Sequence, residues 1–150
     1  MVKNGVSLKK GAKVFLDSMI FIYKFESEIK YGAILEKLFA KIESGYFTGL
    51  TSTLTIAECL TKPKKEGSLA LIAKYIALFR NFPNLEIYPL TFAIAERTAG
   101  IRAEWNLKTP DAIQLATATE AKANIFLTHD LALSKYKHSY ELSNLDHFKI

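Results

Sequence analysis

A short apolar run that ends in a carboxylate constrains the fold of this chain more than any other feature. Val14, Phe15 and Leu16 are apolar at successive positions, and Asp17 follows them directly. A run without polar alternation is typical of a strand covered on both faces, as in the parallel sheets of α/β proteins. Ligands of such sheets bind beyond the carboxyl ends of the strands. Asp17 is therefore placed for chemistry, although a lone Asp before a helix is more often an N-cap.

The rest of the chain alternates between strand-like runs and helical patterns. Periodicity predicts helices over 18–25, 31–44, 54–60, 69–82, 92–105, from 110 onward, and over 131–136. β-Prone runs predict strands over 14–16, 46–51, 85–90, 125–127 and 140–142. We expect Gly45 and Pro63 to end the helices before them, and Thr109 and Pro110 to be the N-cap and N1 residues of the next helix. This alternation predicts an α/β fold with a parallel sheet and right-handed crossovers.

Four acidic residues lie where this sheet would bring them to one edge. Asp17 and Asp130 come directly after predicted strands. Glu58 lies within two helical turns of the second strand, and Asp111 opens a helix. Each acid alone has a structural explanation as a helix cap, a partner of the helix dipole or a solvated residue. Together, acids without basic partners repel one another unless a divalent cation neutralises them, and oxygen ligands indicate Mg²⁺ or Mn²⁺.

Size, cysteine content and charge limit the class of protein. The 150 residues, 49% of them hydrophobic, predict one globular domain over 1–150 with a polar lead-in at 1–12. The single cysteine, Cys59, excludes an internal disulfide and a multi-cysteine zinc site. No apolar run approaches the ~20 residues that span a bilayer, and the N-terminus is too polar for a signal peptide, so we expect no membrane association and a cytoplasmic location. A net charge of +5 is compatible with a polyanionic partner.

Four short motifs carry a resemblance to the PIN-domain nucleases over nearly the whole chain. Asp17-Ser18 after an apolar strand resembles the first motif of that family, and Glu58 at the end of a Thr-Ile-Ala-Glu run resembles the second. The third match is the most specific, with Asp111 inside Thr-Pro-Asp-Ala-Ile-Gln-Leu-Ala-Thr-Ala. Thr128-His129-Asp130 resembles the fourth motif, with His129 where a small polar residue is frequent.

Length and motif order are most similar to the toxins of VapBC-type toxin–antitoxin systems. The resemblance implies a three-layer α/β/α sandwich with a central parallel sheet, metal-dependent RNA cleavage, a homodimer and inhibition by a small antitoxin protein. It implies that Asp17 and Asp111 are the main ligands of Mg²⁺ or Mn²⁺, with Glu58 and Asp130 completing the catalytic site. The helices over 31–44 and 69–82 also favour a dimer, because they carry more apolar residues than one narrow buried stripe needs. A wider buried face would explain the same residues.

Neighbouring residues are candidates for supporting roles. Ser18 and Thr128 could orient carboxylates or waters, and serve equally well as helix caps. Basic residues at the rim could contact phosphates, although solvated surface is their commoner role; the candidates are Lys24, Arg97, Arg102 and Lys108. His129 could reach a leaving group. The alternative function is a catalytically incomplete PIN-like module that binds RNA or regulates, and it predicts neither stabilisation by Mn²⁺ nor RNA cleavage.

Overall fold

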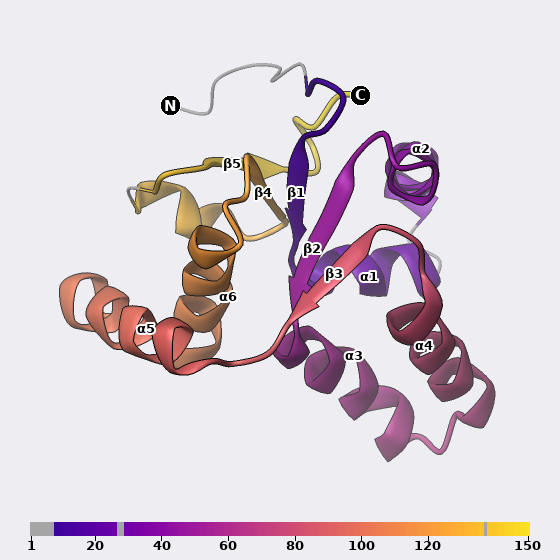
Figure 1. The fold of residues 1–150 in the computed structure, drawn as a ribbon. Coiled ribbons are helices and arrows are strands. Elements are labelled where there is room, and N and C mark those ends of the chain that lie inside the picture. Colours follow the sequence, from indigo (N-terminus) through magenta and orange to yellow (C-terminus); the bar gives the residue numbers. More distant parts are fainter. Residues whose placement is uncertain (1–7, 27–28, 137) are drawn as a thin grey trace.

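A five-stranded parallel sheet runs through the middle of the protein (Figure 1). The computed structural model describes residues 8–26, 29–136 and 138–150. The strands lie in the order β3-β2-β1-β4-β5. Their bounds are β1 Lys13–Leu16, β2 Thr48–Ser52, β3 Leu85–Tyr88, β4 Ile125–Thr128 and β5 Glu141–Asn144. Every hydrogen-bonded pair of strands is parallel, so all five carboxyl ends share one edge.

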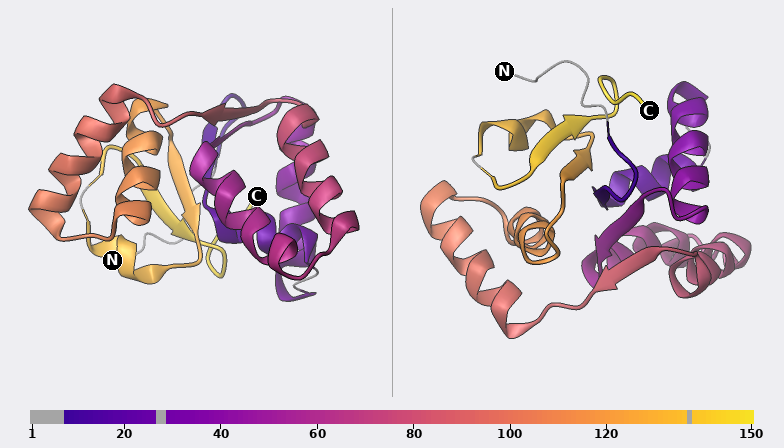
Figure 2. Two further views of the ribbon diagram at one scale, coloured as in Figure 1. Left: turned by 90° about the horizontal axis from the view of Figure 1, so that it is seen from below. Right: turned by 45° about the horizontal axis from the view of Figure 1, so that its top comes forward.

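Helices cover both faces of this sheet. They are α1 Ser18–Phe25, α2 Gly32–Glu43, α3 Thr53–Lys65, α4 Leu69–Asn81, α5 Phe92–Trp105 and α6 Thr109–Glu120, with 3₁₀ turns η1 Ile29–Tyr31 and η2 Leu131–Lys135. Figure 2 shows the first four α-helices on one side of the sheet and α5 and α6 on the other. This arrangement confirms the predicted three-layer α/β/α sandwich. No helix among the described residues is long and apolar enough to cross a membrane.

Apolar residues stand at successive positions of β1 and β4 because each face of these strands meets a different core. Val14 and Leu16 of β1 belong to the core beneath the first four helices, whereas Phe15 belongs to the core beneath α6. Phe126 of β4 stacks on Phe15, with ring centroids 4.9 Å apart. The continuous apolar runs in the sequence therefore reflect strands buried on both faces.

One predicted helix boundary is wrong. We expected Pro63 to end the third helix, but α3 continues through Pro63 to Lys65. The proline removes one backbone donor, yet its ring is buried, and its carbonyl accepts a 2.9 Å hydrogen bond from the backbone N–H of Ser68. Burial of the ring and this bond to the next segment outweigh the weak helix propensity of proline.

Other boundaries differ by a few residues. Lys108, not Thr109, is the N-cap of α6, so Pro110 lies within the first turn rather than at its first position. The second and fifth strands begin later than expected and end later, whereas β3 ends two residues earlier. The segment over 131–136 forms a 3₁₀ turn. Gly45 does follow the end of α2 with a positive φ of 80°, as its expected role as a stop requires. Residues 1–7 of the expected lead-in lie outside the described residues.

The apolar residues of α2 and α4 are mostly used inside the protein. In α2 the side chains of Leu35, Leu38, Phe39 and Ile42 are buried. In α4 the buried side chains are Tyr75, Leu78 and Phe79, and Leu69 at its start is 78% exposed. The wider buried face that we weighed against a dimer interface accounts for these helices.

Candidate active site

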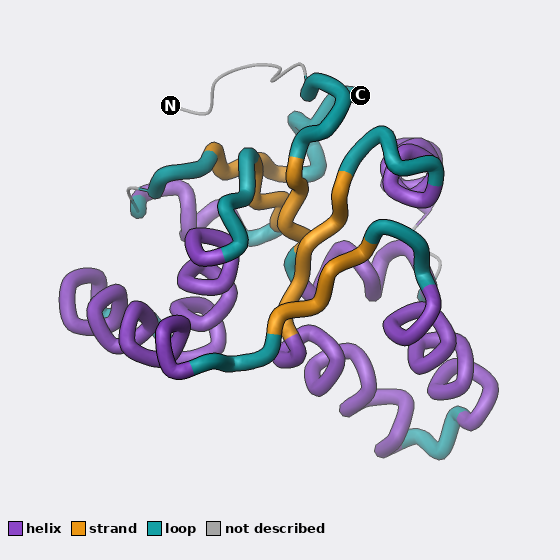
Figure 3. The backbone as a smooth tube through the Cα atoms, in the orientation of Figure 1, coloured by secondary structure: helices purple, strands orange, loops and turns teal. Residues whose placement is uncertain are grey.

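Three helices begin at or near the carboxyl edge of the sheet, namely α1, α3 and the 3₁₀ helix η2. Residue 17 alone separates β1 from α1, and β2 passes into α3 without an intervening loop (Figure 3). β4 ends at Thr128, two residues before Asp130. These short junctions place side chains from distant parts of the chain at one edge, as expected from a parallel sheet.

Asp17 lies at the centre of this edge. One of its oxygens, Oδ1, accepts a 2.8 Å hydrogen bond from the backbone N–H of Ser18, so Asp17 is the N-cap of α1. The other, Oδ2, accepts a 2.8 Å hydrogen bond from the hydroxyl of Thr128 at the end of the neighbouring strand. Burial and, to a smaller extent, the charges of Glu58 and Asp111 raise the pKa of Asp17 to about 6 against the lowering effect of these two bonds. Asp17 is thus both a helix cap and a member of an acidic cluster.

Glu58 reaches the same cluster through Ser18. The buried hydroxyl of Ser18 donates a hydrogen bond to Oε2 of Glu58. The thiol of Cys59 is buried and donates to the backbone carbonyl of Ser18 at 3.7 Å. Ser18, which we considered either a cap or an orienting residue, therefore contacts an acid directly.

Asp111 and Asp130 lie on the far side of Asp17. The pKa of Asp111 is raised by burial and by the charge of Asp130, and lowered by the ammonium of Lys108. Asp130 caps the 3₁₀ turn that follows β4, because its Oδ1 accepts from the N–H of Ala132 at 2.9 Å. Its own N–H donates to the Thr128 hydroxyl at 3.0 Å. Charge interactions therefore link Glu58 to Asp17, Asp17 to Asp111 and Asp111 to Asp130.

The donor chemistry of this edge suits a hard divalent cation, but the spacing is loose. The ligands on offer are carboxylates and hydroxyls, which are the donors that Mg²⁺ and Mn²⁺ prefer. Within the part of the chain that the structure describes, no three His, Cys, Asp or Glu side chains lie close enough to hold a metal ion as they stand. Mg²⁺ is usually bound through one or two carboxylates and several waters, so this spacing is compatible with such a site.

A buried polar network behind the acids was missed at the sequence level. Gln114 of α6 is 3% exposed and contacts hydroxyls from three other elements. These hydroxyls belong to Ser18, Ser52 and Thr55. A signal for it exists in the sequence, because Gln114 lies three residues after Asp111 and so projects from the same side of α6.

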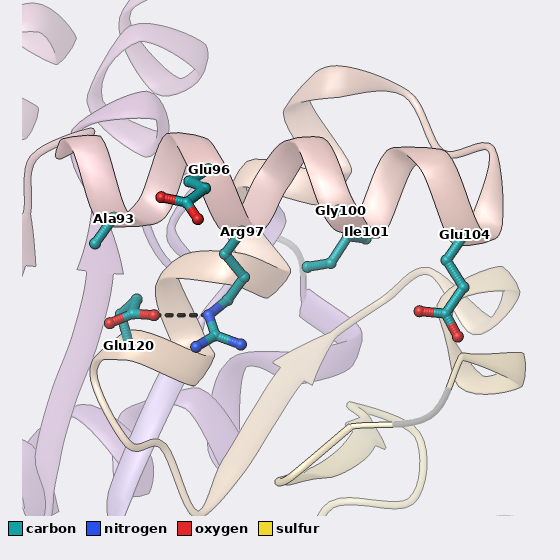
Figure 4. A pocket seen from close by; sticks show the side chains of 7 residues that line it. All are labelled: Ala93, Glu96, Arg97, Gly100, Ile101, Glu104 and Glu120. Carbon is teal, nitrogen blue, oxygen red and sulfur yellow. Dashed lines mark hydrogen bonds and ion pairs between the residues drawn. The ribbon is translucent and has the colours of Figure 1, made fainter.

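Of the four basic residues that we considered for phosphate contacts, one lies near the acids and the other three make contacts elsewhere. Lys108 is close enough to lower the pKa of Asp111. Arg97 pairs with Glu120 at 2.6 Å in a hollow of about 480 Å³ along α5 (Figure 4). Glu120 lies at the opposite end of α6 from Asp111, about 14 Å along the helix. Arg102 donates to the carbonyl of Leu107, and Lys24 lies over the ring of Phe39.

His129 belongs to an aromatic group beside Asp130. Its ring packs nearly perpendicular to Tyr23, with centroids 5.4 Å apart, and at 66° to Tyr31. The Tyr31 hydroxyl donates to Asp146 at 2.9 Å and lies 3.4 Å from Nδ1 of His129. His129 is therefore held by side chains from α1, η1 and the C-terminal segment.

Comparison with known proteins relates the chain to one family and one fold. Residues 14–139 match the family model described as the PIN domain. No curated protein matches the sequence. The structure of VapBC2 from Rickettsia felis bound to a promoter DNA fragment is similar, with 15% identity, a TM-score of 0.71 and coverage of 88% of this chain and 98% of that chain.

Two further solved structures show the same likeness. A toxin–antitoxin complex from Klebsiella pneumoniae has 22% identity and a TM-score of 0.64, and the match covers 88% of this chain and 97% of that one. VapC20 from Mycobacterium tuberculosis, a sarcin-ricin loop cleaving toxin, has 11% identity and a TM-score of 0.65, with coverage of 85% and 98%. At these identities the likeness is one of fold.

Proposed function

Because the chain belongs to the PIN-domain family, we propose that it is a metal-dependent endoribonuclease that hydrolyses RNA phosphodiester bonds. The observation that carries this proposal is the convergence of four acids, from four separate segments, on the carboxyl edge of the sheet. Clustering of mutually repelling carboxylates opposes folding, and such arrangements are typical of functional sites. An RNA substrate agrees with the net charge of +5.

We propose that Asp17 and Asp111 are the main ligands of Mg²⁺ or Mn²⁺, directly or through water, and that Glu58 and Asp130 complete the site. Asp17 accepts one hydrogen bond at each oxygen, which leaves lone pairs on both. When bound, such an ion polarises a phosphoryl oxygen and lowers the pKa of a bound water. Thr128 holds Asp17 in one orientation for this task, and the ammonium of Lys108 is placed to meet a phosphate.

The function requires no protein nucleophile. The chain supplies fixed carboxylates, a buried hydroxyl at Ser18 and a cation at Lys108, all of which position groups rather than form bonds to the substrate. A water attacks the phosphorus, the bond to the leaving oxygen breaks, and the proton of that water passes to solvent or to a carboxylate.

We further propose that the protein is the toxin of a type II toxin–antitoxin pair. Support comes from the fold likeness to proteins solved as VapBC and toxin–antitoxin complexes. A small antitoxin protein is then the expected partner, covering the acidic edge. A homodimer belongs to the same proposal, and Phe92 at 85% and Leu90 at 54% exposure are apolar residues available for it. Light scattering that gives the monomer mass at all micromolar concentrations would exclude the dimer.

One experiment tests the nuclease proposal directly. Purified protein is incubated with a mixture of RNAs in Mn²⁺, Mg²⁺ or EDTA, and the new RNA ends are sequenced. We expect cleavage at defined positions with either metal and none with EDTA. Thermal melts run in parallel should show stabilisation by Mn²⁺. A protein that shows neither effect is the PIN-like binding or regulatory module instead.

A further inference from the structure

The amide of Gln114 joins four elements of the fold at the back of the acidic edge. Its Oε1 accepts a 2.6 Å hydrogen bond from Ser52 at the end of β2. Its Nε2 lies 2.9 Å from the hydroxyl of Thr55 in α3 and 3.4 Å from that of Ser18 in α1. All four side chains are at most 5% exposed. A buried amide with this many partners is costly to remove and fixes the geometry of its neighbours.

The direction of each hydrogen bond in this network follows from one backbone carbonyl. The carbonyl of Leu16 can only accept, so the Thr51 hydroxyl donates its single proton to it at 2.9 Å. Thr55, 2.8 Å from Thr51, must then donate to Thr51. The Thr55 oxygen is left to accept from Gln114, which places the amide nitrogen, rather than its oxygen, on that side.

The same orientation determines what Ser18 does. With Nε2 facing it, the Ser18 oxygen accepts a proton from Gln114, and its own single proton is free for Glu58. An amide turned the other way would present Oε1, compete for that proton and leave Glu58 without its donor. Among the described residues, no hydrogen bond reaches Oε1 of Glu58, so Ser18 is the group that holds this carboxylate.

We propose that Gln114 is a positioning residue for the acidic site, acting on Glu58 through Ser18. The inference rests on the proposed nuclease function and gives a role to a residue other than the four acids. Gln114 lies one helical turn after Asp111, so α6 supplies one acid directly and orients another on the opposite side of the sheet. Gln114 contributes by fixing the direction in which the neighbouring hydroxyls donate their protons. An apolar residue at this position could not do so.

Gln114→Met tests the proposal, because Met has a similar length and no donor. We expect kcat for RNA cleavage at saturating Mn²⁺ to fall about 10- to 100-fold, the range found for residues that orient metal ligands, with a much smaller change in KM. Thr117→Val is the matched control. Thr117 is buried in the same helix and donates only to its own helix at Ile113, so its loss should leave kcat unchanged. An equal fall in both variants would overturn the proposal.

A double-mutant cycle distinguishes positioning from general damage. If Gln114 acts through Ser18, then Gln114→Met should lower kcat no further in a Ser18→Ala background. Independent, multiplying losses would overturn the inference. All variants are assayed well below their melting midpoints, so that unfolding does not contribute.

Side-chain NMR decides the inference even if the parent protein cleaves no RNA, which would refute the proposed function alone. Ser18→Ala should shift the side-chain amide resonances of Gln114. Gln114→Met should shift the Glu58 carboxyl carbon in the same direction as Ser18→Ala does. The positioning role would be overturned if Ser18→Ala left the chemical shifts of the Gln114 side-chain amide unchanged. It would also be overturned if Gln114→Met left the shift of the Glu58 carboxyl carbon unchanged. The first of these measurements does not require the Gln114 variant to fold.

Discussion

The two faces of the sheet are packed by different means. Beneath α1–α4 the core is built from large side chains, among them Phe21, Phe39 and Tyr75. Beneath α6 the core contains Ala118, Ala121 and Ala123 alongside fewer large residues. Small side chains let a helix approach a sheet closely, and α6 packs against β2. The difference explains why α6 reaches hydroxyls and acids that belong to the other face: the closely packed helix is the one that carries Asp111 and Gln114.

The largest expected effect comes from replacing Asp17, the acid at the end of the central strand β1. Asp17→Asn should remove metal-dependent RNA cleavage by orders of magnitude, while the metal-free protein stays as stable as the parent or becomes more stable. Asn can keep the capping bond from Ser18 and contact Thr128, but it lacks the charge. Thermal melts in EDTA and in Mn²⁺ measure both properties. Equal Mn²⁺-induced shifts in parent and variant would show that Asp17 is no ligand.

The packing difference itself predicts opposite sensitivities. Phe21→Ala on the large-residue face should cost about 3–5 kcal/mol by leaving a cavity. Ala118→Leu on the close-packed face should cost about 1–3 kcal/mol by overpacking. Urea unfolding gives both values, and Ala103→Leu on the exposed side of α5 is the control, expected within about 0.5 kcal/mol of the parent. An Ala118→Leu variant as stable as the parent would mean that α6 is not closely packed against the sheet.

The raised pKa of Asp17 predicts a pH dependence of stability without metal. The folded protein binds this proton up to about pH 6, whereas the unfolded chain releases it near 3.8. Native Asp17 therefore holds more proton between these values, and the free energy of unfolding falls as pH rises from about 4 to 6, by up to about 3 kcal/mol from this group. The difference in unfolding free energy between the parent and Asp17→Asn, measured in EDTA across this range, isolates the effect. A constant difference would contradict the raised pKa.

The smallest expected effect comes from replacing Thr91, an N-cap outside the acidic cluster, and it serves as a comparison for the N-cap Asp17. Thr91 caps α5, where its hydroxyl accepts from the N–H of Ile94 at 3.2 Å. Thr91→Ala should cost about 1 kcal/mol of stability, and it should leave the Mn²⁺-induced thermal shift and cleavage unchanged. If Thr91→Ala altered the metal response as Asp17→Asn does, the Mn²⁺-induced shift would depend on the stability of the fold in general and would not identify Asp17 as a ligand.

The sequence predicted the fold better than it predicted the buried residues that position the acids. Apolar and β-prone runs identified all five strands, and the pattern was strongest for β1 and β4, which are buried on both faces. Pro63 misled the prediction, since the burial of its ring in the folded protein is not visible in the local sequence. Asp17 and Asp130 were predicted as site residues from their places directly after strands, and Glu58 and Asp111 from the helices that follow and from the motifs that resemble the PIN family. Gln114 was not predicted: its spacing from Asp111 shows which side of α6 it lies on, but its partners come from β2, α1 and α3, which the local sequence does not reveal.

The strand order has a consequence for when the protein becomes active during its synthesis. The central strand β1 pairs with β2 on one side, but its other neighbour is residues 125–128. Pairing over such a separation cannot begin until that part of the chain has left the ribosome. Thr128, which orients Asp17, and Asp130 emerge in the same late segment. A nascent chain that has folded its first four helices therefore still lacks a complete acidic edge, which forms only after the segment with Thr128 and Asp130 has left the ribosome.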